Sequence, residues 1–151
     1  MATTEIEGVR ATLATLRKLE PALARQSVRD IKAPAVPTAL ALRAVAPPIP
    51  LSGMGAHGPV KATANYGGRR QRSGGWPLVK IKLTAPGWTV SSDMARNSTP
   101  GETMVRNLSA RYGGASRWAW PTVEQHMQSL QAAIARAVAK VERDATDAMK
   151  P

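Results

Sequence analysis

The residues that could support catalysis or metal binding are few, and no acid, base and nucleophile lie together in the sequence. Ser91-Ser92-Asp93 offers hydroxyl groups beside a carboxylate, but no base accompanies it, and such polar residues commonly cap the end of a strand. On a predicted helix, the residues three and four positions from His126 include no acid. Since the chain has no Cys and only one other His, His57, we expect no enzyme activity, no metal and no cofactor.

The segment 114–121, with the sequence GASRWAWP, carries side chains suited to recognition of a partner. It holds two of the four Trp residues, Trp118 and Trp120, which on an extended segment would face the same side. Three interpretations stay open: packing in the core between a hairpin and the last helix, burial at a subunit interface, or stacking on nucleobases. The candidates for a subunit interface are Arg117, Trp118, Trp120, Met127 and Leu130.

Cations outnumber anions throughout the chain. Its 151 residues include 21 Lys and Arg but only 10 Asp and Glu, which gives a net charge of +11. Such a balance favours polyanions or an acidic protein surface as partners, and it favours attraction to phosphate over the reading of bases. The candidates for contact with DNA or another polyanion are Arg69, Arg70, Arg72, Lys80 and Lys82.

Apolar residues spaced three and four positions apart predict the helical elements that must hold these side chains. We expect helices over about 4–19 and 21–32, and helical structure as far as about residue 46 after an interruption at 33–37. The C-terminal helix is expected over about 121–148, where it would reach roughly 40 Å at 1.5 Å per residue. That length exceeds what a small domain needs for its own core, so part of this helix is expected to pack on something else.

The middle of the chain predicts a loop and a small sheet. The Gly-rich, basic stretch of about 51–75 is expected to be a mobile loop. Apolar residues alternate with Lys80 and Lys82, which predicts a strand at 78–83, and a turn at Pro86-Gly87 would lead to a second strand at 88–90. Residues 60–66 are a candidate third strand.

These elements predict one α+β domain that spans residues 1–151. It would consist of an N-terminal helix pair, a small antiparallel β-hairpin or three-stranded sheet, and a long C-terminal helix. The β region would cover about 76–95, and a linker would cover about 96–120. The N-terminus has no long apolar run, which argues against a signal peptide or a membrane span, so the chain is expected in a cytoplasm or in a particle assembled there.

The order of these elements resembles the tail-component proteins of long-tailed bacteriophages, the family of neck, tail-completion and head-to-tail joining proteins. The most specific part is the step RWAWPTVE at residues 117–124 into a basic helix, preceded by NLSARYG at 107–113, which is similar to the linker of that family. The chain departs from the common pattern at 51–53, where a Thr-Gly step is usual, and at 91–95, where a Tyr-rich segment is usual. The position within the neck therefore stays open among adaptor, stopper, completion and terminator proteins.

The resemblance implies a non-enzymatic structural protein of the virion neck, assembled in the host cytoplasm. It implies a homo-oligomeric ring, expected to be sixfold, between the portal complex and the tail tube. Its implied partners are the neighbouring portal, adaptor or stopper proteins and the tail-tube or tail-terminator proteins, with non-specific contact to DNA that passes through the channel and none to a membrane. Two alternatives remain: a small basic nucleic-acid-binding protein and a minor capsid component.

Overall fold

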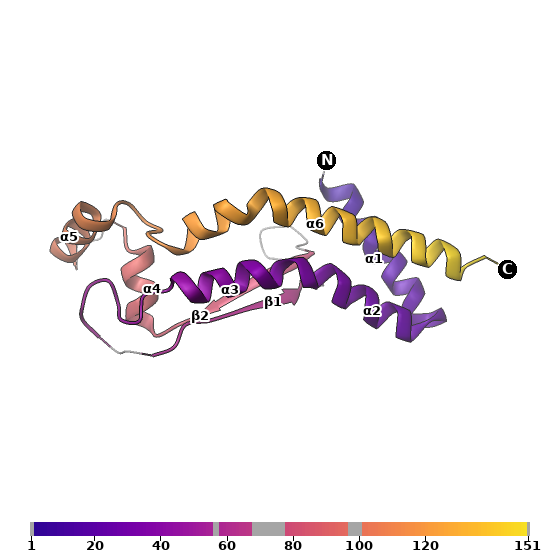
Figure 1. The fold of residues 1–151 in the computed structure, drawn as a ribbon, viewed down its shortest axis with the longest axis horizontal. Coiled ribbons are helices and arrows are strands. Elements are labelled where there is room, and N and C mark those ends of the chain that lie inside the picture. Colours follow the sequence, from indigo (N-terminus) through magenta and orange to yellow (C-terminus); the bar gives the residue numbers. More distant parts are fainter. Residues whose placement is uncertain (1, 56–57, 68–77, 97–100, 151) are drawn as a thin grey trace. The chain divides into compact units, whose positions relative to one another are not determined.

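The first two helices form where the apolar spacing predicts them (Figure 1). A computed structural model of the chain describes residues 2–55, 58–67, 78–96 and 101–150. Helix α1 (Ala2–Leu19) and helix α2 (Pro21–Lys32) meet at Glu20, because Pro21 suits the first turn of a new helix and disfavours a helical conformation in the residue before it. Both predicted helices are confirmed.

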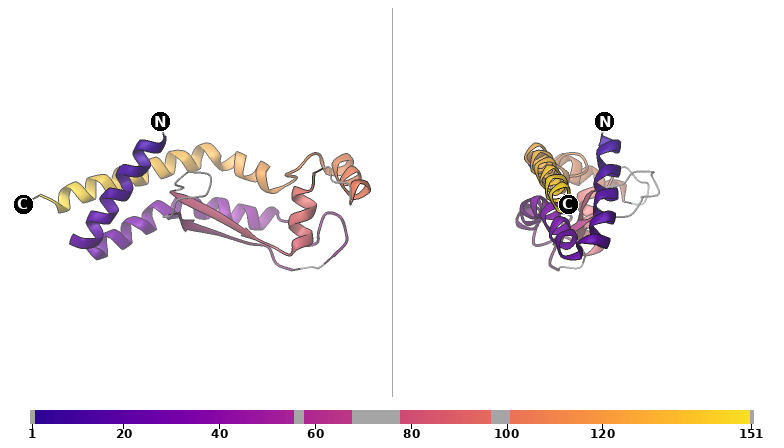
Figure 2. Two further views of the ribbon diagram at one scale, coloured as in Figure 1. Left: turned by 180° about the vertical axis from the view of Figure 1, so that it is seen from behind. Right: turned by 90° about the vertical axis from the view of Figure 1, so that its right-hand side faces the viewer.

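The described chain divides into two compact units, and the first consists of Met1–Val36, Ala64–Ile81 and Gln128–Pro151. Its core forms where α1, α2 and the C-terminal part of α6 (Ala119–Ala148) lie next to one another (Figure 2). One cluster consists of Val9, Leu13, Ile31 and Val141, and a smaller one of Leu16, Ala24 and Ala145. The predicted C-terminal helix is confirmed, and its apolar stripe supplies the α6 side of this core.

An ion pair joins α2 to α6 in the first unit. Lys140 Nζ lies 2.6 Å from Asp30 Oδ2 and 3.4 Å from Asp144 Oδ2. The hydrogen bond from Lys140 lowers the pKa of Asp30 below its usual value of 3.8, with a further contribution from Gln26 that burial partly opposes. The Lys140 side chain is 52% exposed, so water screens the pair and its effect on stability is small.

This pair is expected to give the folded chain a weak dependence on acidity. Because folding lowers the pKa of Asp30, the contribution is present above the unfolded-state pKa and is lost as the pH falls through the folded-state value. The variant Asp30→Asn should therefore flatten the acid limb of a plot of denaturation midpoint against pH and leave the plot above pH ~6 parallel to that of the wild type. An acid limb identical to that of the wild type would contradict this account of the pair.

The second unit consists of Pro37–Thr63 and Lys82–Met127 and is built mainly from helices. After a short 3₁₀ turn, η1 (Ala33–Ala35), the chain continues as α3, and two further helices precede the start of α6. The buried side chains of this unit are mostly small or polar, unlike the core of the first. The helices are α3 (Val36–Val45), α4 (Gly87–Met94) and α5 (Glu102–Tyr112).

The sheet is a two-stranded antiparallel hairpin of β1 (Lys61–Tyr66) and β2 (Val79–Thr84). The Gly67 N–H donates to the Leu78 carbonyl at 2.9 Å, which places residue 65 opposite 80 and residue 63 opposite 82. The strand predicted at 78–83 is confirmed, and the candidate strand at 60–66 is its partner. Part of the predicted loop at 51–75 is therefore a strand, while 56–57 and 68–77 lie outside the described residues.

The prediction of a second strand at 88–90 is wrong, because these residues belong to α4. The Thr89 N–H donates to the Pro86 carbonyl at 2.9 Å, so Pro86-Gly87 starts a helix and does not form a hairpin turn. The buried positions of α4 are Thr89, Ser92 and Asp93, and this spacing of three and four is helical. Burial of that face outweighs the preference of Trp, Thr and Val for strands.

The predicted linker at 96–120 is also wrong over most of its described length, because it contains α5 and the first two residues of α6. Residues 97–100 lie outside the described residues. Val105 and Leu108 are buried at helical spacing, and Gly101 and Gly113, both with positive φ, flank the helix. Two buried residues among polar neighbours are a weak signal in a sequence, which is why the helix was missed.

The fold class is confirmed as α+β, with N-terminal helices, a two-stranded antiparallel hairpin and a long C-terminal helix. That the whole chain acts as a single domain stays a prediction. Within the described residues, no helix combines the length and the apolar character that crossing a membrane requires.

Candidate functional site

The carboxylate of Asp93, on α4, accepts hydrogen bonds from the main chain that leads into α6. The side chain is 1% exposed. Its Oδ1 lies 2.8 Å from both the Arg117 N and the Trp118 N, and its Oδ2 accepts the hydroxyl of Ser116 at 2.6 Å. Ser116 Oγ in turn accepts the N–H of Trp120 at 3.1 Å. Asp93, which belongs to α4, therefore accepts the main-chain N–H groups that immediately precede α6. Its negative charge suits the positive end of the α6 dipole.

Arg117 donates hydrogen bonds to the carbonyl groups at the C-terminal end of α4. Its Nη1 donates to the carbonyl oxygens of Ser92 at 2.8 Å and Asp93 at 3.0 Å, and it lies 3.3 Å from that of Ala95. Its Nη2 donates to Ser109 Oγ on α5 at 3.3 Å. The guanidinium thus covers the last carbonyl groups of α4, where a positive charge is favourable. We call Asp93, Ser116 and Arg117 the capping cluster, since together they hold the end of α4 against the start of α6.

The buried polar groups of the Ser91-Ser92-Asp93 segment are engaged within the chain, and Ser91 is its one exposed residue. Both Asp93 oxygens are occupied, and Ser92 Oγ donates to the Thr89 carbonyl at 3.0 Å while it accepts the Leu51 N–H at 3.1 Å. Among the described residues there is no group of three or more His, Cys, Asp or Glu side chains placed to hold a metal ion. The arrangement positions helices and engages most of its polar groups in doing so, whereas Arg117 Nε is buried without a partner.

The two Trp side chains of segment 114–121 lie in different environments. Trp118 is 9% exposed, whereas Trp120 is 53% exposed and donates its Nε1–H to Glu124 at 2.9 Å. The prediction that both face the same side is wrong, because α6 already begins at Ala119 and each helical residue turns the chain by about 100°. Trp118 is therefore buried within its own chain, and Trp120 remains a candidate for an interface.

Large apolar side chains are exposed mainly on the second unit. Twelve such side chains are exposed among the described residues, and nine of them belong to this unit. Val90 and Met94 stand four residues apart on α4 and so share one face of that helix. The three in the first unit are Leu19, Val36 and Met149. The nine in the second unit are Leu40, Val45, Ile49, Met54, Trp88, Val90, Met94, Tyr112 and Trp120.

The other predicted site residues differ in burial, and three of them lie outside the described residues. Met127 and Leu130, on α6, are half-buried within the chain. Lys80 and Lys82 are exposed on β2, as the alternating pattern predicts. The other three candidates for contact with a polyanion, Arg69, Arg70 and Arg72, lie outside the described residues. The sequence indicates neither the role of Asp93 nor that of Arg117, because 24 positions separate the two residues.

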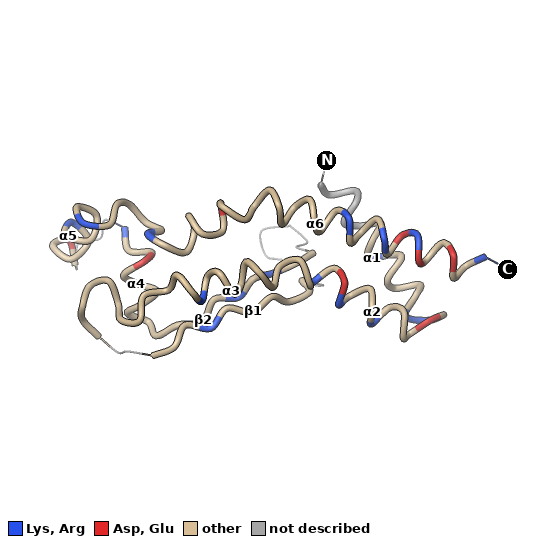
Figure 3. Tube along the Cα trace, in the orientation of Figure 1, with Lys and Arg blue, Asp and Glu red and all other residues tan. Residues whose placement is uncertain are grey.

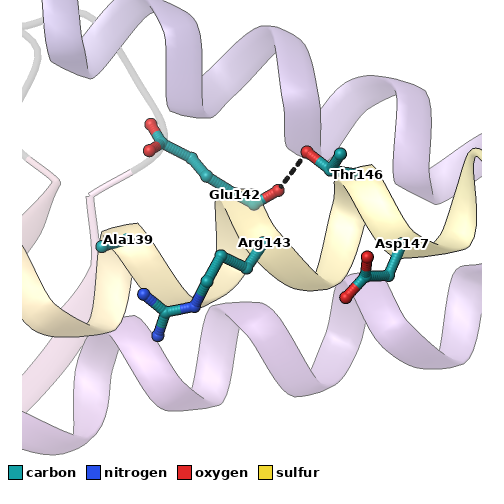
Figure 4. Close-up of a pocket in the computed structure, with 5 residues that line it drawn as sticks. All are labelled: Ala139, Glu142, Arg143, Thr146 and Asp147. Carbon is teal, nitrogen blue, oxygen red and sulfur yellow. Dashed lines mark hydrogen bonds between the residues drawn. The ribbon is translucent and has the colours of Figure 1, made fainter.

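A shallow pocket on the first unit is lined by one helix only (Figure 4). Its polar groups are engaged locally: the Thr146 hydroxyl donates to the Glu142 carbonyl at 2.8 Å, and the Asp147 carboxylate lies 2.7 Å from Lys150 Nζ. Lining residues from about two turns of one surface helix do not converge on a ligand. These residues are Ala139, Glu142, Arg143, Thr146 and Asp147.

Two features of the second unit are therefore the basis for a functional assignment. One is the capping cluster, which fixes helices, and the other is the set of exposed large apolar side chains, among which Val90 and Met94 share one face of α4. Comparison of the chain with known protein families, with curated proteins and with solved structures gave no match.

Proposed function

We propose that the protein is a structural subunit of the neck of a long-tailed bacteriophage, where copies of it form a ring that joins the DNA-filled head to the tail. The observation that carries the proposal is the exposure of nine large apolar side chains on the second unit. Large exposed apolar side chains that share one face mark a surface that a partner covers, and Val90 and Met94 share one face of α4. The partner we assign is a second copy of the chain, because a ring repeats one interface between identical subunits.

Two further observations support this proposal. The polar residues of segment 114–121 act within the chain as helix caps, so the segment is a structural joint with Trp120 exposed beside it. The same segment carries the RWAWPTVE step that resembles the head-to-tail joining family. A rigid joint next to an exposed aromatic residue suits a subunit interface, in which Trp residues often contribute much of the binding energy.

Self-association of the purified protein tests the assigned surface. Sedimentation velocity should show the wild type as a closed oligomer. The double variant Val90→Ser with Met94→Ser, which removes the exposed apolar face of α4, should associate at least about tenfold more weakly, a change of about 1.4 kcal/mol. The matched control is Leu19→Ser with Met149→Ser, which removes two apolar side chains that are 61% and 52% exposed on the first unit and should associate like the wild type.

Either of two results would contradict the assigned surface: a wild type that stays monomeric, or equal weakening by both double variants. The role in the virion is tested separately by growing the phage without the protein. Filled heads and unattached tails are expected by electron microscopy. Complete infectious particles without the protein would refute the proposed function.

A further inference from the structure

The outer face of the β-hairpin carries cations and neutral polar side chains but no acid. Alternate residues of β1 and β2 are exposed, and the register brings them to the same face of the sheet. The opposite face carries Tyr66 and Val79, which pack against the core of the first unit. The six exposed residues are Lys61, Thr63, Asn65, Lys80, Lys82 and Thr84.

The register spreads the charges over this face. Lys80 lies opposite Asn65, and Lys82 lies opposite Thr63, so each ammonium group has a polar neighbour across the strands. Lys80 and Lys82 stand two residues apart on one strand, a separation of about 7 Å along the strand. A row of separated ammonium groups can contact several phosphates of one backbone.

Nothing in the described chain neutralises these lysines. No Asp or Glu occurs anywhere between residues 31 and 92. Figure 3 accordingly shows basic positions and no acidic ones along the hairpin. Lys140 and Lys150 on α6 and after it pair with acids, whereas Lys61, Lys80 and Lys82 form no ion pair with any described residue.

We propose that this face, which we call the lysine face (Lys61, Lys80 and Lys82 with the polar residues between them), binds the phosphate backbone of double-stranded DNA without regard to sequence. Its cations match the regular charges of a duplex, and none of its six residues is aromatic, so it offers no platform for unpaired bases. The inference adds a ligand to the proposed function but does not depend on ring formation, because all the contacts lie on one hairpin.

A salt titration of DNA binding tests the lysine face. Fluorescence anisotropy with a labelled duplex of random sequence gives the slope of log K against log salt concentration. This slope is negative, and each lost phosphate contact reduces its magnitude by about 0.9, so the triple variant Lys61→Gln, Lys80→Gln, Lys82→Gln should reduce the magnitude by about 2–3. The corresponding triple Lys→Arg variant should bind like the wild type, because it keeps the charges.

A matched triple variant separates the lysine face from net charge. Lys18→Gln, Arg25→Gln and Arg29→Gln remove the same charge from exposed positions on α1 and α2, where Glu20 and Asp30 lie nearby. This control should change the slope by less than about 1. Equal effects of the two triples would overturn the assignment, since net charge alone would then explain binding, and so would a wild type that does not bind duplex DNA.

Competition and sedimentation complete the test. Polyglutamate that displaces the duplex at equal charge concentration would overturn the choice of DNA, since the face would then bind any polyanion. Circular dichroism of each variant verifies that it is folded before its binding is compared. Sedimentation of the same variants keeps the two proposals apart: a chain that forms rings but does not bind DNA refutes only this inference, and one that binds DNA through the lysine face as a monomer refutes only the ring.

Discussion

Replacement of Asp93 by alanine is expected to lower the free energy of unfolding by about 2–4 kcal/mol, because it leaves the Trp118 N–H without an acceptor and leaves the Arg117 N–H with only the main-chain carbonyl of residue 93, 3.3 Å away. Both main-chain nitrogens lie 2.8 Å from Asp93 Oδ1. The Ser116 hydroxyl loses its acceptor as well. Urea denaturation followed by circular dichroism measures the change by linear extrapolation.

Two further variants show whether the caps are the cause. Asp93→Asn keeps one acceptor oxygen of similar geometry and should cost only about 1–2 kcal/mol. Asp147→Ala removes a carboxylate whose side chain is 69% exposed and should leave stability unchanged within about 0.5 kcal/mol. The capping account fails if Asp93→Ala is as mild as Asp147→Ala.

The two Trp residues of segment 114–121 are expected to respond in opposite ways to truncation. Trp118→Ala should cost about 3–5 kcal/mol of unfolding free energy, because it empties a buried site that a large ring fills. Trp120→Ala removes a side chain that is 53% exposed and whose indole bonds only to Glu124, so it should cost less than about 1 kcal/mol. Its effect should appear instead as weaker self-association.

Denaturation and sedimentation of the same two variants provide the measurement. Trp118→Phe is the matched control for the buried site: it keeps an aromatic ring and should recover more than half of the loss seen with alanine. Equal losses of stability in Trp118→Ala and Trp120→Ala would show that the two side chains share one environment. Unchanged association of Trp120→Ala would remove Trp120 from the proposed interface.

Elements whose signals are local could be predicted from the sequence alone. The apolar stripes of α1 and α6 extend over many residues, so their periodic burial could be predicted without the fold. The break between α1 and α2 could be predicted from Glu20-Pro21. The alternation around Lys80 and Lys82 likewise predicted β2 and the exposure of both lysines. Propensity and periodicity act between neighbours in the chain, and such neighbours are what a sequence displays directly.

Which distant segments meet depends on the three-dimensional fold. The partner of β2 proved to be β1, and residues 88–90 became helical because the face with Thr89, Ser92 and Asp93 is buried in the second unit. The capping cluster joins Asp93 to residues 116–118 across more than twenty positions, and that junction starts α6 early enough to bury Trp118 and expose Trp120. Hydrogen bonds between the ends of two helices depend on where the fold places those ends, and no spacing in the sequence encodes that placement.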